Sequence, residues 1–300
     1  SDVYKRQDMI HMYSLVPVKS GMRSYCVVRS PPGRPQQNLF SFGCRLVYSM
    51  NSDEYIASRK GEVMKLDRDV KIKYLGHSTF LFTTPGGKRI LIDPWVENNP
   101  ACPAADKQLD RLDTMLITHG HGDHMGDALS LARRFKPKIA CIHEIALWLG
   151  GKGVGNVTGM NKGGSVQVGD IRATMVNALH SSSIVEDDGT IVYAGEAAGY
   201  VVEFENGFRI YHAGDTCVFS DMRIIADLYK PELLFLPIGD LYTMSPAEAA
   251  YACRLMNPQF VIPMHYATFP VLTGTPEQFI EATRDYGVEV IVMKPGESID

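Results

Sequence analysis

Hydrophobic and polar positions alternate regularly only from about residue 70 onward. Short apolar runs bounded by turn residues predict β-strands. They lie at residues 70–75, 79–83, 89–92, 114–118, 138–142, 200–204 and 208–212. Pro85-Gly86-Gly87 separates two of these runs, and Asn206-Gly207 separates two others, as expected for tight turns between paired strands. The pattern therefore indicates a strand-rich domain.

Helical segments lie between and after these strands. Residues 127–135 and 144–149 are predicted helices, the second closed by Gly150. Ser245-Pro-Ala-Glu is a capping box that predicts a helix to about Met256, and Thr275-Pro-Glu-Gln predicts a last helix ending at Gly287. Residues 150–164 are rich in glycine but lack the Lys-Ser/Thr of a phosphate-binding loop, so we interpret them as a mobile loop near a site.

Strands recur in both halves of the sequence with helices between them. This order predicts an α/β fold, an αββα sandwich of two mixed sheets with helices on both outer faces. Because no boundary divides residues 64–300, we expect a single domain there. Residues 1–63 show no period, contain four prolines between 17 and 35 and have no acidic residue from 9 to 52. We interpret them as a disordered or spurious extension; the prolines disfavour the alternative of a helical targeting leader.

The charge distribution excludes several partners. The chain has 30 Lys and Arg against 34 Asp and Glu; residues 64–300 have 21 against 29, a net charge of −8. No basic block indicates nucleic-acid binding, and no apolar run reaches the roughly 18 residues of a membrane span. Six cysteines without a C-x-x-C pair are typical of reduced thiols. We expect a cytoplasmic protein with a small-molecule substrate and no nucleic-acid or membrane partner. Assembly into a homo-oligomer remains open.

The run Thr-His-Gly-His-Gly-Asp-His at residues 118–124 places four potential metal ligands within six positions. Its glycines allow a tight turn that brings several side chains to one point. Imidazole and carboxylate groups together suit Zn, Mn, Fe or Ni. This spacing predicts a metal site.

Three further candidates each follow an apolar run that resembles a strand. They are His180, Asp215 and His265. Loops at strand ends are where a rigid sheet presents reactive groups. Alone, each would more often be an ordinary hydrogen-bonded residue, but their order after the first motif favours a shared site.

These motifs resemble those of the metallo-β-lactamase superfamily over residues 64–300. The resemblance is strongest to small metal-dependent hydrolases similar to ascorbate-6-phosphate lactonases, and phospholipases acting on N-acyl ethanolamine lipids are more distant. The matching segments are residues 76–80, 91–94, 119–124, 180–182, 212–216 and 263–269. Asp240 departs from this branch, where we expect Gly. The fold hosts many activities, so the motifs identify no substrate.

The resemblance implies two divalent metal ions. Zn is the expected metal, with Mn or Fe as alternatives. The first ion would be held by His119, His121 and His180, and the second by Asp123, His124 and His265. Asp215 would bridge them. The implied activity is a binuclear metal-dependent hydrolase that uses a metal-bridged hydroxide on a small ester, lactone or phosphoester, so that no Ser or Cys nucleophile is required.

Four other roles are predicted around this centre. Asp123 would orient the hydroxide, His77 would contact substrate or water, and Tyr266 would donate to a developing oxyanion. Asp93 would support a ligand histidine as a hydrogen-bond acceptor, or form a structural turn.

Two other activities occur on this fold. A di-iron redox protein is disfavoured because no flavin or rubredoxin-like domain is visible in the sequence. A nuclease is disfavoured by the acidic body and by the lack of an added RNA-handling domain.

Overall fold

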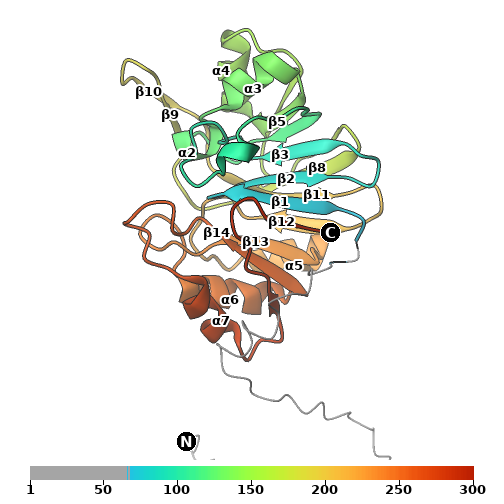
Figure 1. The fold of residues 1–300 in the computed structure, drawn as a ribbon, viewed down its shortest axis with the longest axis vertical. Helices are drawn as coiled ribbons and strands as arrows, with labels where there is room; N and C mark the ends of the chain where they lie inside the picture. The colour runs from blue at the N-terminus through green and yellow to red at the C-terminus, as the bar shows by residue number, and fades with distance from the viewer. Residues whose placement is uncertain (1–65, 67) are drawn as a thin grey trace, which may run out of the picture. The chain divides into compact units, whose positions relative to one another are not determined.

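The computed structural model describes Leu66 and residues 68–300, so the expectations for residues 1–63 fall outside it. In this part of the chain the strands form two seven-stranded sheets and a two-stranded hairpin (Figure 1). The first sheet has the order β16-β1-β2-β3-β4-β5-β6 and the second β15-β14-β13-β12-β11-β8-β7. Parallel and antiparallel pairs occur in both, as predicted for two mixed sheets.

The bounds of the first-sheet strands are β1 (Lys71–Gly76), β2 (Thr79–Thr83), β3 (Arg89–Ile92), β4 (Thr114–Leu116), β5 (Lys138–Ile142), β6 (Val157–Met160) and β16 (Ser298–Ile299). Those of the second are β7 (Ser165–Val168), β8 (Ile171–Asn177), β11 (Ala198–Glu203), β12 (Arg209–His212), β13 (Leu233–Pro237), β14 (Phe260–Met264) and β15 (Glu289–Val290). The hairpin consists of β9 (Ser183–Val185) and β10 (Ile191–Tyr193).

Helices cover the sandwich. They are α2 (Gly122–Met125), α3 (Ala128–Phe135), α4 (His143–Gly151), α5 (Met222–Tyr229), α6 (Pro246–Met256), α7 (Pro276–Thr283) and the short 3₁₀ helix η1 (Ala104–Asp106). α4 packs beside β5 and β6, whereas α5, α6 and α7 pack together at the opposite end of the molecule (Figure 1). Both predicted capping boxes are present, at Ser245 and Thr275. Within the described residues, no helix is long and apolar enough to cross a membrane.

Two expectations about elements need correction, and one strand pairing has no counterpart among the predictions. The glycine-rich segment 150–164 is not a loop throughout, because Val157–Met160 form β6 beside β5. The last helix ends at Thr283 rather than Gly287; the Thr283 hydroxyl donates to the Phe279 carbonyl 2.8 Å away, inside the last turn. The C-terminal β16 pairs with β1 in the first sheet, although it comes last in the sequence.

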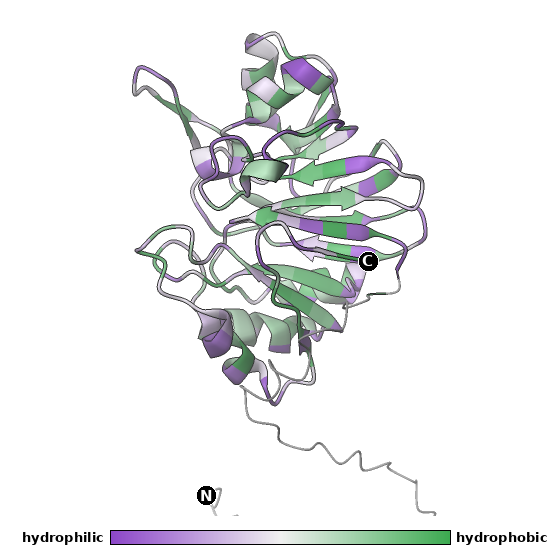
Figure 2. Cartoon of the chain, in the orientation of Figure 1, coloured by the Kyte–Doolittle hydropathy of each residue, from purple (hydrophilic) through white to green (hydrophobic). Residues whose placement is uncertain are grey.

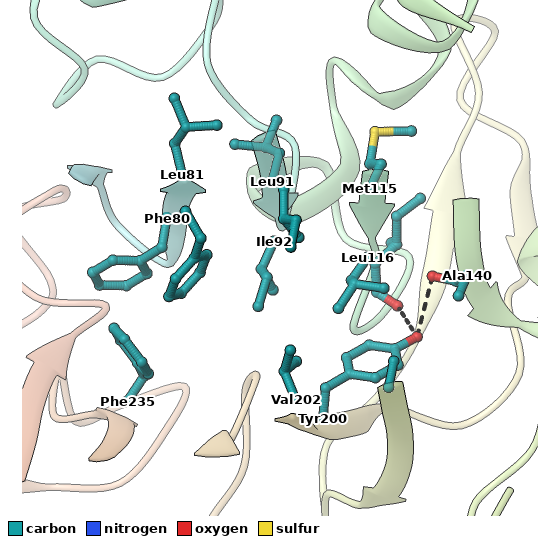
Figure 3. Close-up of a cluster of buried hydrophobic side chains, with 14 of the residues drawn as sticks. Phe80, Leu81, Leu91, Ile92, Met115, Leu116, Ala140, Tyr200, Val202 and Phe235 are labelled. Carbon is teal, nitrogen blue, oxygen red and sulfur yellow. Dashed lines mark hydrogen bonds between the residues drawn. The ribbon is translucent and has the colours of Figure 1, made fainter. Parts of the chain in front are cut away.

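The core lies between the sheets and continues under the helices. Figure 2 shows hydrophobic residues concentrated along the strands and hydrophilic ones on helix surfaces and turns. Figure 3 shows aromatic and aliphatic side chains from both sheets meeting, such as Phe80 and Phe235, whose ring centroids are 4.6 Å apart. The buried Tyr200 hydroxyl lies 3.0 Å from the Ile117 carbonyl and 3.3 Å from that of Ala140, so its polar end has partners across the sandwich.

The topology brings several strand ends to one edge. β12, β13 and β14 are parallel neighbours, and β8 runs in the same direction as β12 because both are antiparallel to β11. In the first sheet β3, β4 and β5 are parallel. Carboxyl ends of such strands are where loops present functional groups in open sheets.

Candidate metal centre

The seven predicted ligands, together with His77, come together at this edge. Their ligand atoms form three groups, each with all atoms within 4.8 Å of one another: His119, His121 and His180; His119, His124 and Asp215; and His77, Asp123, His124 and His265. The local folding explains the convergence. The glycine-spaced motif turns from β4 into α2, while His180, Asp215 and His265 follow β8, β12 and β14.

The first group contains three imidazoles. His119 Nε2 lies 3.1 Å from His121 Nδ1, and the His119 and His180 ring centroids are 5.3 Å apart. His119 is fully buried, and that burial, followed by the charge of His124, lowers its pKa well below 6.5. Burial also lowers the pKa of His121 and His180. Neutral imidazole is the form that binds a metal ion, so the environment favours ligation.

The third group, which contains His77, Asp123, His124 and His265, adds a carboxylate. Asp123 Oδ2 lies 3.2 Å from His77 Nε2, and the ring centroids of His77 and His265 are 3.9 Å apart. The pKa of Asp123 is lowered: burial raises it, but the hydrogen bond from His77 and the charge of His124 outweigh burial. This carboxylate is therefore ionised at neutral pH.

Asp215, in the remaining group with His119 and His124, lies between the first and third groups. Its Oδ2 is 3.0 Å from His265 Nε2, 3.7 Å from His180 Nε2 and 4.0 Å from His119 Nε2. Its Oδ1 is 3.3 Å from His124 Nε2. Burial raises the pKa of this carboxyl group, but the charges of His124 and His265 more than offset that and hold it well below 3.8. One ionised carboxylate thus faces imidazoles of both groups.

The residues fit a bound divalent ion. Among the described residues, buried polar atoms without a hydrogen-bond partner include His124 Nε2 and Asp215 Oδ1, which face each other at 3.3 Å. Buried polar groups nearly always have partners, so two such atoms facing each other require an explanation. Cations between them would supply the missing interactions, and imidazole with carboxylate is a donor set typical of Zn, Mn and Fe.

Asp93 occupies the supporting position that the sequence predicts. Its Oδ2 accepts hydrogen bonds from His124 Nδ1 at 2.8 Å and from the Thr118 hydroxyl at 2.9 Å, and its Oδ1 accepts from the Thr118 backbone N–H at 2.9 Å. The proton on His124 Nδ1 leaves Nε2 free for a metal ion. Asp215 and Asp93 together outweigh burial and raise the pKa of His124, so a proton and a metal ion compete for this Nε2.

His77 lies in one group of potential metal ligands with Asp123, His124 and His265. It is fully buried with a positive φ of 59°. Its Nδ1 lies 2.9 Å from the Thr268 hydroxyl, and its Nε2 faces Asp123. Burial, followed by the charge of His265, lowers the pKa of His77 to about 4, so its ring is neutral at pH 7. Its predicted contact with substrate or water stays a prediction.

The geometry does not support the predicted role of Tyr266. The hydroxyl donates to the Met293 carbonyl at 3.4 Å. The ring packs against the buried hydrophobic side chains that lie around α6 and α7. Burial, followed by the charges of Glu277 and Glu297, raises its pKa to about 12. The structure thus directs this hydroxyl to the backbone instead of bringing it into the metal-ligand groups.

Several supporting residues were not found from the sequence. The Ser182 hydroxyl accepts from the Gly120 N–H at 3.1 Å and donates to the Ala194 carbonyl at 3.1 Å, which joins the first motif to the β9–β10 hairpin. Trp95 and Phe269 flank His77 at 5.3 and 5.6 Å between ring centroids. Only their positions beside the Asp93 and His265 motifs could have indicated them.

Comparison with known proteins adds independent information. The model of the β-lactamase superfamily domain matches residues 88–266. A UPF0173 metal-dependent hydrolase of Koribacter versatilis is 55% identical over 232 residues, which cover 76% of this chain and 97% of that protein. The chain belongs to this family. Another member, from Methanosarcina barkeri, is 48% identical over 77% of this chain and 98% of its own length.

Solved structures of related proteins have the same fold. Igni18, described as a novel metallo hydrolase from Ignicoccus hospitalis, is 37% identical with a TM-score of 0.67, over 76% of this chain and 97% of Igni18. An isothiocyanate hydrolase from Delia radicum gut bacteria is 20% identical with a TM-score of 0.56, over 77% of this chain and 98% of that one. The second likeness concerns the fold alone. Membership of the UPF0173 family makes this chain a metal-dependent hydrolase, and the family name specifies no substrate.

Proposed function

We propose that this chain is a binuclear hydrolase of small esters, lactones or phosphoesters. The observation that carries the proposal is the position of Asp215, whose carboxylate lies within 4.0 Å of imidazole nitrogens from both ligand groups. His119, His121 and His180 would hold one ion, and Asp123, His124 and His265 the other, with Asp215 shared. Zn is our first choice of metal, with Mn or Fe as alternatives.

Divalent ions in such a pair polarise a substrate oxygen and make water acidic enough to act as a nucleophile at neutral pH. The protein side chains then have three tasks. Asp123, whose side chain is 29% exposed, would orient the attacking water. His77 holds the orientation of Asp123, and Asp93 fixes the ring of His124.

This proposal is tested with purified protein loaded separately with Zn, Mn and Fe. Elemental analysis measures the bound metal, and a panel of a carboxylic ester, a lactone, a phosphomonoester, a phosphodiester and the β-lactam nitrocefin measures activity. We expect two equivalents of metal and hydrolysis of at least one ester, lactone or phosphoester. We expect nitrocefin to be a poor substrate, with a kcat/KM below about 10⁴ M⁻¹s⁻¹. Folded protein that binds a single equivalent would contradict the binuclear centre.

A further inference from the structure

The segments that form the metal centre contain no lysine or arginine. In the described part of the chain, these segments are residues 74–83, 93–106, 117–132, 178–198, 213–222, 238–253 and 264–283. They include every loop that supplies a metal-ligand candidate. Arginine and lysine are the usual partners of phosphate groups, through bidentate hydrogen bonds or as point charges. Apart from the metal ions themselves, these segments provide no cation to hold an anionic substrate.

Two basic side chains that reach these segments from outside, Lys162 and Lys152, already have partners. Lys162 Nζ lies 2.8 Å from Asn177 Oδ1 and 3.1 Å from Glu196 Oε2. Lys152 Nζ lies 2.9 Å from Glu186 Oε2, on the β9–β10 hairpin. In both pairs the positive charge is balanced by a glutamate.

The loop after β13 adds negative charge. Asp240 is exposed and has a positive φ of 64°, in a region of backbone conformation that favours glycine. Its Oδ1 accepts from the Leu241 N–H at 2.8 Å, and its Oδ2 accepts from the Thr273 hydroxyl at 3.4 Å. The carboxylate therefore links the loop after β13 to the loop after His265. An anionic substrate approaching these loops would be repelled.

The same loops expose apolar side chains, which we call the apolar rim: Leu179, Leu241, Tyr242 and Val271, with exposed fractions of 48%, 63%, 56% and 47%. Leu179 directly precedes His180, and its backbone N–H donates to the Thr216 hydroxyl beside Asp215 at 2.9 Å. Val271 lies in the loop that begins at His265. Each of these two residues is therefore on a loop that carries a metal-ligand candidate.

Leu241 and Tyr242 are held close to the centre by backbone packing. β13 lies between β12 and β14, the strands that lead to Asp215 and His265. Gly239 fits so tightly that a Cβ there would overlap the His265 carbonyl oxygen. The exposed pair begins two residues later. Leu241 has a positive φ of 45°, which is unfavourable for leucine and typical of strained functional loops.

An aromatic wall continues the apolar surface on the His77 side. Trp95 and Phe269 each contact the His77 ring edge-to-face, and their own ring centroids are 6.1 Å apart. Trp95 is 8% exposed, and Phe269 is partly buried. A substrate group on the Trp95 and Phe269 side of His77, away from Asp123, would therefore meet aromatic carbon.

We propose that the substrate is an electrically neutral carboxylic ester or lactone with an apolar acyl or alkyl part, and not a phosphorylated compound. The metal ions would engage the reacting oxygen in either case, so the surrounding residues decide between the classes. Contact with the apolar rim and with the aromatic wall would stabilise the binding of an apolar group, because apolar surface is removed from water. A phosphate dianion would have no basic side chain to pair with and would face Asp240.

This inference rests on the proposed hydrolase function, and the experiment separates the two. Metal-loaded protein is assayed with p-nitrophenyl acetate, butyrate and hexanoate, and with p-nitrophenyl phosphate, which share one leaving group. We expect kcat/KM for the hexanoate to exceed that for the acetate by at least about tenfold, because added methylenes bury apolar surface. We expect p-nitrophenyl phosphate to be at least about 100-fold poorer than the hexanoate.

Two matched variants test the apolar rim. Leu241→Ser removes an exposed leucine from the rim, whereas Leu228→Ser removes one that is 66% exposed on α5. We expect Leu241→Ser to lower the ratio of kcat/KM for the hexanoate to that for the acetate by about threefold. This is roughly the change expected when one methylene loses its apolar contact. Leu228→Ser should leave the ratio unchanged. Calorimetric titration with acetohydroxamate and hexanohydroxamate provides a binding readout, and only Leu241→Ser should reduce the preference for the longer chain.

Each outcome decides the matter. If p-nitrophenyl phosphate is hydrolysed as efficiently as p-nitrophenyl hexanoate, this inference is overturned and the hydrolase function stays intact. Equal ratios in Leu241→Ser and Leu228→Ser, with both proteins folded, would also overturn it. If protein with two bound metal equivalents hydrolyses none of these compounds and no other member of the panel, both the hydrolase proposal and this inference are wrong.

Discussion

Asp215 shows how one buried side chain can join two groups of ligands. Its two oxygens face different sets of imidazoles, and removing the carboxylate would take away both a shared ligand and the charge that offsets repulsion between two cations. His265, by contrast, would bind only the second ion in the proposed centre. The two residues should therefore differ in how much metal their loss releases.

We expect metal retained after dialysis to decrease in the order wild type, His265→Ala, Asp215→Ala. Activity should fall by several orders of magnitude in both variants, because the proposed mechanism uses both ions. Elemental analysis measures the metal, and circular dichroism verifies folding. Two equivalents of metal in folded Asp215→Ala would rule out the bridging role.

Asp93 offers a second test at the scale of a residue. In Asp93→Asn one oxygen becomes an NH₂ donor, so the three hydrogen bonds from Thr118 and His124 cannot all be kept. We expect affinity for the second ion to weaken by about 10- to 100-fold while the first ion is retained. Competition with a chromophoric chelator measures both constants. Unchanged affinity for both ions would show that Asp93 only stabilises the turn.

At the scale of the element, His212 at the end of β12 fastens the second sheet to the turn that carries His77. Its Nε2–H donates to the Ser78 carbonyl at 3.0 Å, and its Nδ1 accepts from the Gly214 N–H at 3.2 Å. The ring is fully buried, and burial lowers its pKa below 6.5. Protonation of Nδ1 would remove the acceptor, so this arrangement depends on the neutral ring.

This predicts a pH dependence of stability. Because the folded pKa lies below that of the unfolded chain, the unfolded state takes up the proton first as pH falls. The contribution is present above about pH 6.5 and is lost progressively below it. Wild type should therefore lose more unfolding free energy than His212→Gln between pH 7.5 and 5.5, measured by urea denaturation in one metal buffer. Parallel losses in the two proteins would argue against this role.

The elements differ in how well the sequence predicts them. Strands such as β2 and β3 were predicted at their observed bounds, because alternation and the turn at residues 85–87 act locally. β6 was missed because its neighbour β5, and not its own Val-Thr-Gly-Met sequence, makes it a strand. The convergence of the candidate ligands could be anticipated from the motif at residues 118–124 and from the family resemblance, whereas the hydroxyl of Tyr266 could not be oriented without the Met293 carbonyl.

At the scale of the molecule, residues 66 and 68–300 contain both sheets and all the metal-ligand candidates. The UPF0173 relative from Koribacter versatilis aligns over 97% of its own length with only 76% of this chain. A protein beginning at Met64 should therefore fold and bind metal as the full chain does. Thermal unfolding and elemental analysis of both proteins test this. A truncated protein that is insoluble, or that loses most of its thermal stability, would show that residues 1–63 are required.

The pairing of β16 with β1 has a consequence for synthesis on the ribosome. β1 leads into His77, and its outer edge is completed by Ser298 and Ile299, which are made after every metal-ligand candidate. The backbone of Leu66 also bonds to that of Asp300. Domains generally fold as units during synthesis. The first sheet is complete only once residue 299 has been made, so a nascent polypeptide stalled before residue 298 would already carry every metal-ligand candidate yet leave the strand beside His77 with an open edge.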